Sequence, residues 1–184
     1  MCVSLTRRVF LAGAPLFLAG CATSGMPNRM TKPAKRQIPE YYRQMYAAID
    51  SEPFPIPAPD LTKIEEKYYR QEVAYSGYEP AGTIVVDTAQ RFLYLVLGDG
   101  RAIRYGIGVG KAGLEFEREP ERYGPLANGM EPGPTNPLGA RALYLFKDGQ
   151  DTLYRIHGTN EDWSIGRAIS SGCIRMLNQD VIDL

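Results

Sequence analysis

The chain has 184 residues and a mass of 20.4 kDa, which is the size of one ordinary domain. Its 44% apolar and 23% charged residues are typical of a globular protein and exclude a repeat array or a largely disordered chain. The 21 basic residues equal the 21 acidic residues, so there is no net positive field to attract nucleic acid, and we expect no nucleic-acid partner.

The N-terminus has the pattern of an export signal. Two arginines precede an uncharged apolar run, residues 9–19, which is shorter than the roughly 20 residues of a membrane-spanning helix and is interrupted by Pro15. Residues 18–21, Leu-Ala-Gly-Cys, resemble a bacterial lipobox, and an ordinary small-residue cleavage site is the alternative. We predict a signal peptide over 1–20, exported by the twin-arginine or the general route. Lipidation of Cys21 would then anchor a periplasmic protein to a bacterial membrane.

The next sixty residues divide into a tether and a small helical region. Residues 21–38 are mostly small and polar, as in a flexible tether. Helical patterns cover 39–49 and 61–75, and alternating prolines in the stretch between them favour an extended polyproline segment. We expect this Pro-rich region, residues 39–81, to pack on the main domain.

From residue 82 onward the sequence indicates strands. Short β-branched and aromatic runs are separated by tight-turn signals such as Gly98-Asp99-Gly100. The predicted strands are 83–87, 92–96, 102–109, 142–146 and 152–157. We predict a mostly β, mostly antiparallel fold over 82–184, built as a β-sandwich or small barrel with short helices.

A long surface loop is predicted over 111–139, which is rich in glycine, proline and charge. The glycines at its entrance include Gly106 and Gly108, and they allow a phosphate loop to be considered. However, no helical pattern and no Gly-Lys-Ser/Thr sequence follows them, so turn and bulge positions are the favoured interpretation.

The C-terminal segment contains the only histidine, His157, and a cysteine, Cys173. If Cys2 is removed with the signal and Cys21 is lipidated, the mature chain offers Cys173 no second thiol for a disulfide. A thiol becomes a strong nucleophile only as a thiolate, and a neighbouring imidazole can take its proton. We predict a helix from Met176 onward, whose dipole would favour a thiolate near its start. Either residue alone is more often structural, so the case rests on the pair.

Two short motifs make the case specific. His-Gly-Thr-Asn at 157–160, followed by Ser-Ser-Gly-Cys-Ile-Arg-Met at 170–176, resembles the signature of the YkuD-type L,D-transpeptidases, bacterial enzymes that remodel peptidoglycan. The resemblance implies acyl transfer on a stem tetrapeptide: the terminal D-Ala leaves, and a thioester remains until an amine acceptor resolves it. It implies no cofactor and no metal, and it makes peptidoglycan stem peptides the partners.

The resemblance also assigns roles to individual residues. Cys173 would be the nucleophile, and His157 would be the base that takes its proton and later the acid that protonates the leaving amine. Backbone N–H groups around Ser171 and Gly172 would form the oxyanion hole. Arg175 would bind a substrate carboxylate through its planar fork, and a purely structural ion pair is the alternative. Other polar residues nearby, Asn160 and Asn178 among them, are weaker candidates.

The chain departs from the family pattern in three places. Ser171 stands where many relatives have a histidine, residues 111–114 lead almost directly into a charged stretch, and Leu184 ends the sequence before a final strand that we expect in the family. Two rival functions therefore stay open. One is an L,D-carboxypeptidase, in which water resolves the same acyl-enzyme. The other is a degenerate, non-catalytic lipoprotein that binds the cell wall.

Overall fold

The computed structural model describes residues 36–110, 130–170 and 172–184. The predicted signal peptide, the lipidation site Cys21, nearly all of the tether, the first part of the long loop and Ser171 lie outside the described residues. The chain divides into two units, Met1–Ala34 and Lys35–Leu184, and the structural description concerns the second. None of its described helices has the length and apolar character needed to cross a membrane.

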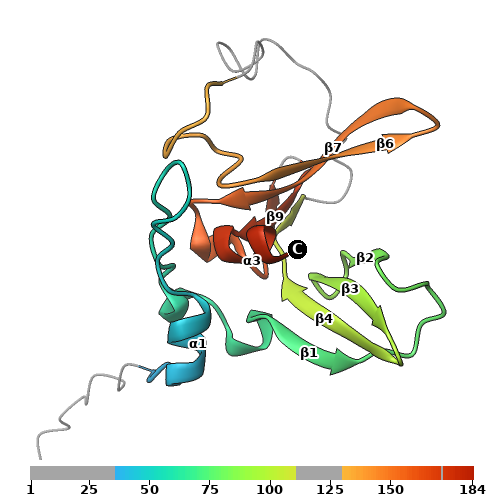
Figure 1. Cartoon of the computed structure of the whole chain (residues 1–184), viewed down its shortest axis with the longest axis horizontal. Helices are drawn as coiled ribbons and strands as arrows, with labels where there is room; N and C mark the ends of the chain where they lie inside the picture. Colours follow the sequence, from blue (N-terminus) through green and yellow to red (C-terminus); the bar gives the residue numbers. More distant parts are fainter. Residues whose placement is uncertain (1–35, 111–129, 171) are drawn as a thin grey trace, which may run out of the picture. The chain divides into compact units, whose positions relative to one another are not determined.

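Strands dominate the described residues and form three sheets, which confirms the mostly β fold class (Figure 1). The first sheet is antiparallel, in the order β1-β4-β3-β2, and comprises β1 (Gln71–Ala74), β2 (Ile84–Asp87), β3 (Phe92–Gly98) and β4 (Arg101–Gly106). The second pairs β5 (Val109–Gly110) in parallel with β8 (Ala168–Ser170). The third has the order β6-β7-β9 and comprises β6 (Ala142–Lys147), β7 (Gln150–Thr159) and β9 (Ile174–Leu177). In this sheet β7 runs antiparallel to β6 and parallel to β9.

Helices are short. The helix α1 (Glu40–Met45) lies within the first predicted helix. The second predicted helix, 61–75, is wrong: the chain forms the 3₁₀ turns η1 (Leu61–Lys63) and η2 (Glu66–Tyr68) and then enters β1. The guanidinium of Arg36 donates to the carbonyl oxygens of Leu61 and Ile64 at 2.6 and 2.5 Å. These two carbonyls therefore bind a distant side chain and not the backbone N–H groups of an α-helix. Tertiary packing overrides the local helical pattern here.

The predicted helix from Met176 onward is also wrong at its start. Residues Ile174–Leu177 pair with β7 as strand β9, and only then does α3 (Asn178–Asp183) begin; the short turn η4 (Asp162–Ser164) lies earlier, between β7 and β8. Pairing with β7 buries Met176 and Leu177 completely, which outweighs the helical pattern of the segment. Cys173 therefore precedes a strand, so the proposed support of its thiolate by a helix dipole does not apply.

Two apolar clusters form the core. One combines Tyr46 and Tyr69 of the Pro-rich region with Phe92, Ile165 and Leu177 of the main domain. The other lies between the first and third sheets, where the buried side chains of Leu93, Tyr105, Ile107, Ile156 and Met176 meet. Because successive strand residues point to opposite faces, the core-facing positions of β7 and β9 leave their other face available for a site.

Close backbone approach explains two glycines at the entrance of the long loop. A Cβ on Gly108 would lie 2.8 Å from the carbonyl oxygen of Ser164, and a Cβ on Gly106 would overlap the backbone of Tyr68. Gly108 also exchanges two backbone hydrogen bonds with Arg175, at 2.9 and 2.8 Å. These two glycines are therefore required by close packing and not by the turns or bulges that the sequence favours, and the Gly108 hydrogen bonds hold the chain before β5 against β9.

A buried polar cluster ties the Pro-rich region to α3. Asp180 is fully buried; its Oδ2 accepts a hydrogen bond from the Tyr46 hydroxyl at 3.2 Å, and its Oδ1 lies 3.9 Å from Arg70 Nε. Arg70 also pairs with Asp183, which accepts a 2.7 Å hydrogen bond from the Tyr105 hydroxyl. Burial raises the pKa of Asp180 to about 7, and the Arg70 charge opposes that rise. The cluster joins residues that lie more than a hundred positions apart.

Candidate active site

The two candidate catalytic residues lie on neighbouring strands, β7 and β9, and on the same face of their sheet. Ile156 is paired with Ile174 and His157 with Arg175, and the two isoleucines belong to the core cluster. The side chains of His157 and Arg175 therefore point away from that core, and the same alternation places Cys173 on their face. His157 is paired with Arg175, which is two residues after Cys173 on the adjacent strand. The Cα atoms of His157 and Cys173 are therefore roughly 8 Å apart.

His157 is held as a neutral base. Its side chain is 5% exposed, and its Nδ1 lies 2.6 Å from the carbonyl oxygen of Gly158. Because a carbonyl oxygen only accepts, Nδ1 carries the proton, and Nε2 of the neutral ring is left as an acceptor. Burial lowers the pKa of His157, the Gly158 hydrogen bond opposes this, and the Arg175 charge lowers the pKa further. The imidazole is therefore uncharged at neutral pH.

Cys173 is half-buried and is a thiol at rest. Burial raises the pKa of its side chain, whereas a hydrogen bond with the Arg155 backbone and the charges of Arg155 and Arg175 lower it, with burial the largest cause. The raised pKa of the thiol and the lowered pKa of His157 both oppose an imidazolium–thiolate pair in the free protein. In the free protein Cys173 is therefore a thiol and His157 a neutral imidazole, and both lie on the same face of the sheet.

The remaining predicted site residues have different outcomes. Gly172 has φ +118°, a backbone conformation that side chains other than glycine rarely adopt, so a glycine is required next to Cys173. Ser171 lies outside the described residues, and the predicted oxyanion hole stays a prediction. The Nη1 of Arg175 lies 2.6 Å from the Glu161 carboxylate, which places a guanidinium at the site with a carboxylate already bound to it.

Comparison with known proteins decides the family. The family model for the L,D-transpeptidase catalytic domain, YkuD, matches residues 81–184, which is more than half of the chain and includes both candidate catalytic residues. The chain belongs to the YkuD L,D-transpeptidase family.

Several curated YkuD-family proteins resemble this chain. The probable L,D-transpeptidase ErfK/SrfK of Escherichia coli K12 is 32% identical over 123 residues, which cover 53% of this chain and 38% of that protein. The putative L,D-transpeptidase YkuD of Bacillus licheniformis is 41% identical over 101 residues, which cover 55% and 56%. The chain thus spans about two fifths to just over half the length of these relatives. The crystal structure of a probable carnitine operon oxidoreductase from Brucella melitensis is 46% identical, covering 67% of this chain and 90% of that chain, with a TM-score of 0.45, too low to support an argument on the fold.

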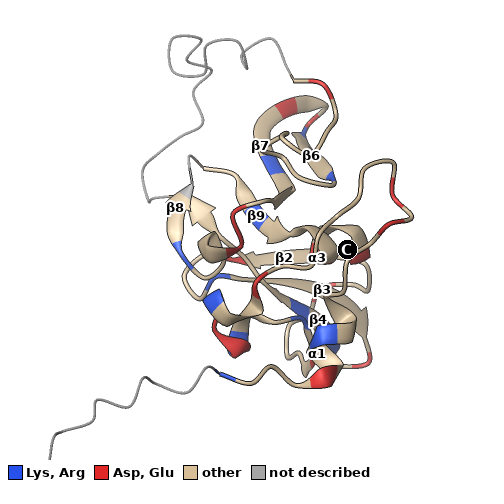
Figure 2. Ribbon diagram, turned by 90° about the vertical axis from the view of Figure 1, so that its left-hand side faces the viewer, with Lys and Arg blue, Asp and Glu red and all other residues tan. Residues whose placement is uncertain are grey.

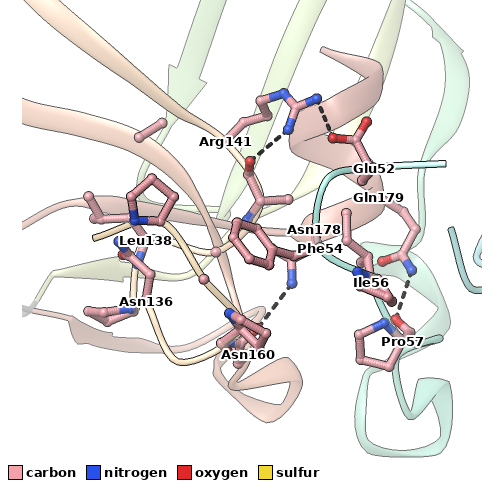
Figure 3. Close-up of a pocket in the computed structure, with 18 of the residues that line it drawn as sticks. Glu52, Phe54, Ile56, Pro57, Asn136, Leu138, Arg141, Asn160, Asn178 and Gln179 are labelled. Carbon is pink, nitrogen blue, oxygen red and sulfur yellow. Dashed lines mark hydrogen bonds and ion pairs between the residues drawn. The ribbon is translucent and has the colours of Figure 1, made fainter. Parts of the chain in front are cut away.

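A groove of about 1030 Å³ lies beside the YkuD-family site (Figure 3). Its lining comes from the Pro-rich segment 52–59, which precedes the family match, from the segment 130–142, and from Asn160, Asn178 and Gln179. Neither Cys173 nor His157 lines it. However, Ala142 and Tyr144 do, and they are the strand partners of His157 and Arg155. The groove is therefore adjacent to the site along β6.

The two asparagines considered as weaker candidates are hydrogen-bonded to each other at the groove. Asn178 Nδ2 donates to Asn160 Oδ1 at 3.2 Å (Figure 3), and Asn178 Oδ1 accepts from the Ala140 backbone at 2.9 Å. Asn160 in turn donates to the carbonyl of Pro134 at 2.8 Å. These hydrogen bonds secure the segment before β6 against the end of β7, and a role for either residue in substrate binding stays a prediction.

Sequence reasoning missed three residues on the site face: Asp151, Arg155 and Tyr144. Arg155 is two residues before His157, and this spacing in a strand is the signal for a shared face. Basic segments lie on both β7 and β9 in Figure 2. What the sequence does not reveal is that β9 runs parallel to β7 and places Arg155 level with Cys173.

Proposed function

We propose that this YkuD-family chain is a peptidoglycan L,D-transpeptidase that works through Cys173 and His157. The observation that carries the proposal is the register of β7 and β9, which gives one sheet face both a half-buried thiol and a neutral imidazole with Nε2 unprotonated. The names of the curated relatives support the same reaction class.

The first half of the reaction forms a thioester. His157 Nε2 takes the proton from Cys173 Sγ as the sulfur attacks the carbonyl carbon that joins meso-diaminopimelate to the terminal D-Ala. The carbon–nitrogen bond then breaks, and the imidazolium gives the proton that it took from Cys173 to the nitrogen of the departing D-Ala. D-Ala therefore leaves with a complete amino group. The shortened stem peptide stays bound to Cys173 as a thioester.

The second half transfers that acyl group to an amine. The nitrogen of the acceptor amine attacks the thioester carbon while His157 takes a proton from that nitrogen. The carbon–sulfur bond then breaks, and His157 passes the proton to the sulfur, which restores the Cys173 thiol. Arg175 would hold a carboxylate of the stem peptide, and Glu161 occupies its guanidinium until the substrate arrives. Backbone N–H groups at Gly172 would donate to the oxyanion in both halves.

Product analysis tests the proposed function and separates it from hydrolysis. The purified full chain is incubated with a disaccharide-tetrapeptide, and D-Ala, cross-linked dimer and disaccharide-tripeptide are quantified. A transpeptidase gives cross-linked dimer in amounts matching the D-Ala released. Tripeptide with no dimer at any acceptor concentration would identify an L,D-carboxypeptidase instead, and binding to sacculi with no D-Ala release would identify a wall-binding protein.

The pH profile reports the state of His157. Burial holds the pKa of His157 below its ordinary 6.5, and only the neutral ring can accept the thiol proton. We therefore expect kcat/KM for D-Ala release to fall on the acid side with a midpoint below pH 6.5. The Arg101→Gln variant should keep that profile, because Arg101 lies on the first sheet and pairs with Glu72 at an exposed position. An acid-side midpoint above pH 6.5 in the wild-type protein contradicts this assignment.

A further inference from the structure

Arg155 is a cation whose charge acts on Cys173 and to which the sequence motif gives no role. The β7–β9 register pairs Ile156 with Ile174, and continuing it by one residue sets Arg155 level with Cys173. A hydrogen bond with the Arg155 backbone and the charge of its guanidinium both act on the thiol. Arg155 therefore contacts Cys173 through its main chain, and its guanidinium charge acts on the thiol from a neighbouring strand.

The guanidinium of Arg155 is fixed from two sides. Its Nη1 and Nη2 each lie 2.7 Å from an oxygen of the Asp151 carboxylate, which is the bidentate arrangement. Its Cζ lies 3.9 Å from the centre of the Tyr144 ring on the neighbouring strand. The side chain is 12% exposed. A fork held by a carboxylate and an aromatic face has little rotational freedom, so its charge has a fixed position relative to Cys173.

The stretch of β7 between Asp151 and Arg155 is irregular. The β6–β7 register shifts between Tyr144 and Phe146, and Leu153 has φ +64°. Residues four apart lie on the same face of a strand, and within this stretch the Leu153 backbone N–H donates to the Asp151 carboxylate at 2.8 Å. The irregular part of β7 is therefore the part in which the Asp151 carboxylate binds the Arg155 guanidinium.

We propose that Arg155 is a positioning residue that stabilises the thiolate of Cys173 during acyl transfer, with Asp151 and Tyr144 fixing its guanidinium. The proposal rests on the proposed function of Cys173 as the nucleophile. Burial alone disfavours an anionic sulfur, and His157 is neutral until it takes the proton. The other described charged groups on this face are Arg175 with its partner Glu161 and Asp151, the partner of Arg155, so a carboxylate offsets part of the charge of each arginine. A cation fixed on the face that carries the sulfur lowers the free energy of the thiolate that attacks.

The two partners of the ion pair have opposite expected effects, which separates this role from a structural one. Arg155→Gln removes the cation, so the thiolate becomes less favourable. Asp151→Asn removes the neighbouring negative charge and keeps an amide oxygen for the Leu153 N–H, so the thiolate becomes more favourable. If the pair only stabilised the hairpin, both variants would lower the unfolding midpoint and neither would shift the titration of Cys173.

The test measures the rate of Cys173 alkylation by iodoacetamide against pH in the full chain. Tryptic cleavage after Arg167 and Arg175 places Cys173 in the peptide 168–175, so mass spectrometry separates it from Cys2 and Cys21. In Arg155→Gln we expect the alkylation midpoint to rise and the rate at pH 7 to fall on the order of tenfold. In Asp151→Asn the midpoint falls, and in Arg155→Lys, which keeps the charge, it lies between those of the wild type and Arg155→Gln.

Midpoints that stay unchanged, or that move in the same direction in Arg155→Gln and Asp151→Asn, overturn the proposal. Thermal unfolding of each variant shows whether it is folded, and Arg155→Lys with Asp151→Asn suffices if Arg155→Gln does not fold. Arg101→Gln is the matched control, since it also removes an arginine from an ion pair on a strand. D-Ala release that persisted in Cys173→Ala would instead refute the proposed function and leave the titration result standing.

Discussion

Replacement of Cys173 by alanine is expected to lower the rate of D-Ala release from a disaccharide-tetrapeptide by at least about 10³-fold. The variant retains His157 with its hydrogen bond to Gly158, but no thiol is left from which the imidazole can take a proton. It should also form no adduct with an acylating β-lactam such as a carbapenem. The measurements are D-Ala by a coupled assay and intact mass after β-lactam treatment.

The control for this loss is the fold. Cys173 is half-buried and its replacement removes one sulfur atom, so the thermal unfolding midpoint should stay close to that of the wild type. Arg101→Gln should retain the wild-type rate, because its ion pairs with Glu72 and Asp99 lie at exposed positions of the first sheet. If Cys173→Ala released D-Ala at the rate of the wild type, the chemistry would belong to another residue.

Replacement of Arg70 by methionine should destabilise the fold by about 3–5 kcal/mol at pH 8. Asp180 is fully buried, and its Oδ1 accepts no hydrogen bond from the described residues and lies 3.9 Å from Arg70 Nε. Without Arg70 an ionised Asp180 would keep only the Tyr46 hydroxyl as a partner. Chemical denaturation at a series of pH values measures the loss.

The pH dependence of this loss has a definite sign. Burial raises the pKa of Asp180 to about 7, above its ordinary 3.8, so the folded state binds the proton more tightly than the unfolded chain. Stability from this group is therefore fully present below pH 4 and declines as the pH rises toward 7. The Arg70→Met loss should be smaller at pH 5, where Asp180 is protonated, than at pH 8.

A double variant supplies the control for Arg70→Met. Asp180→Asn removes the buried charge, so the Arg70→Met/Asp180→Asn protein should recover part of the stability at pH 8 and lose the pH dependence. Arg101→Met, which breaks an exposed pair, should leave the stability close to that of the wild type at both pH values. A loss for Arg70→Met that was equally large at pH 5 and pH 8 would show that side-chain packing, not the charge of Asp180, is responsible.

The strands could be predicted because their signals are local. The β-branched and aromatic runs of β3, β4, β6 and β7 and the glycine turns at 98–100 and 147–150 each lie within a few residues. The helix predictions for 61–75 and for the start of the segment from Met176 onward are wrong because these conformations depend on distant partners: Arg36 binds carbonyls of the first, and β7 pairs with residues 176 and 177 of the second. No periodicity within either segment encodes those contacts.

The site shows the same division. The residue types and the surrounding motif select His157 and Cys173, whose catalytic roles stay a prediction, and the structure places both on one sheet face and in their uncharged forms. Arg155 could not be predicted, because an arginine in a strand next to a hairpin looks like a solvated residue until the parallel β7–β9 register sets it beside Cys173. The cluster around Asp180 was equally hidden, since Tyr46, Arg70 and Asp180 are far apart in the sequence.

Mass spectrometry of the peptide 168–175 after a brief reaction with disaccharide-tetrapeptide tests the central claim most directly. The account predicts that this peptide gains the mass of the substrate minus D-Ala, attached at Cys173, and that an added amine acceptor removes it. Release of D-Ala with no such mass on the peptide under conditions that trap a thioester, or with the acyl group on another residue, would contradict the assignment of Cys173 as the nucleophile.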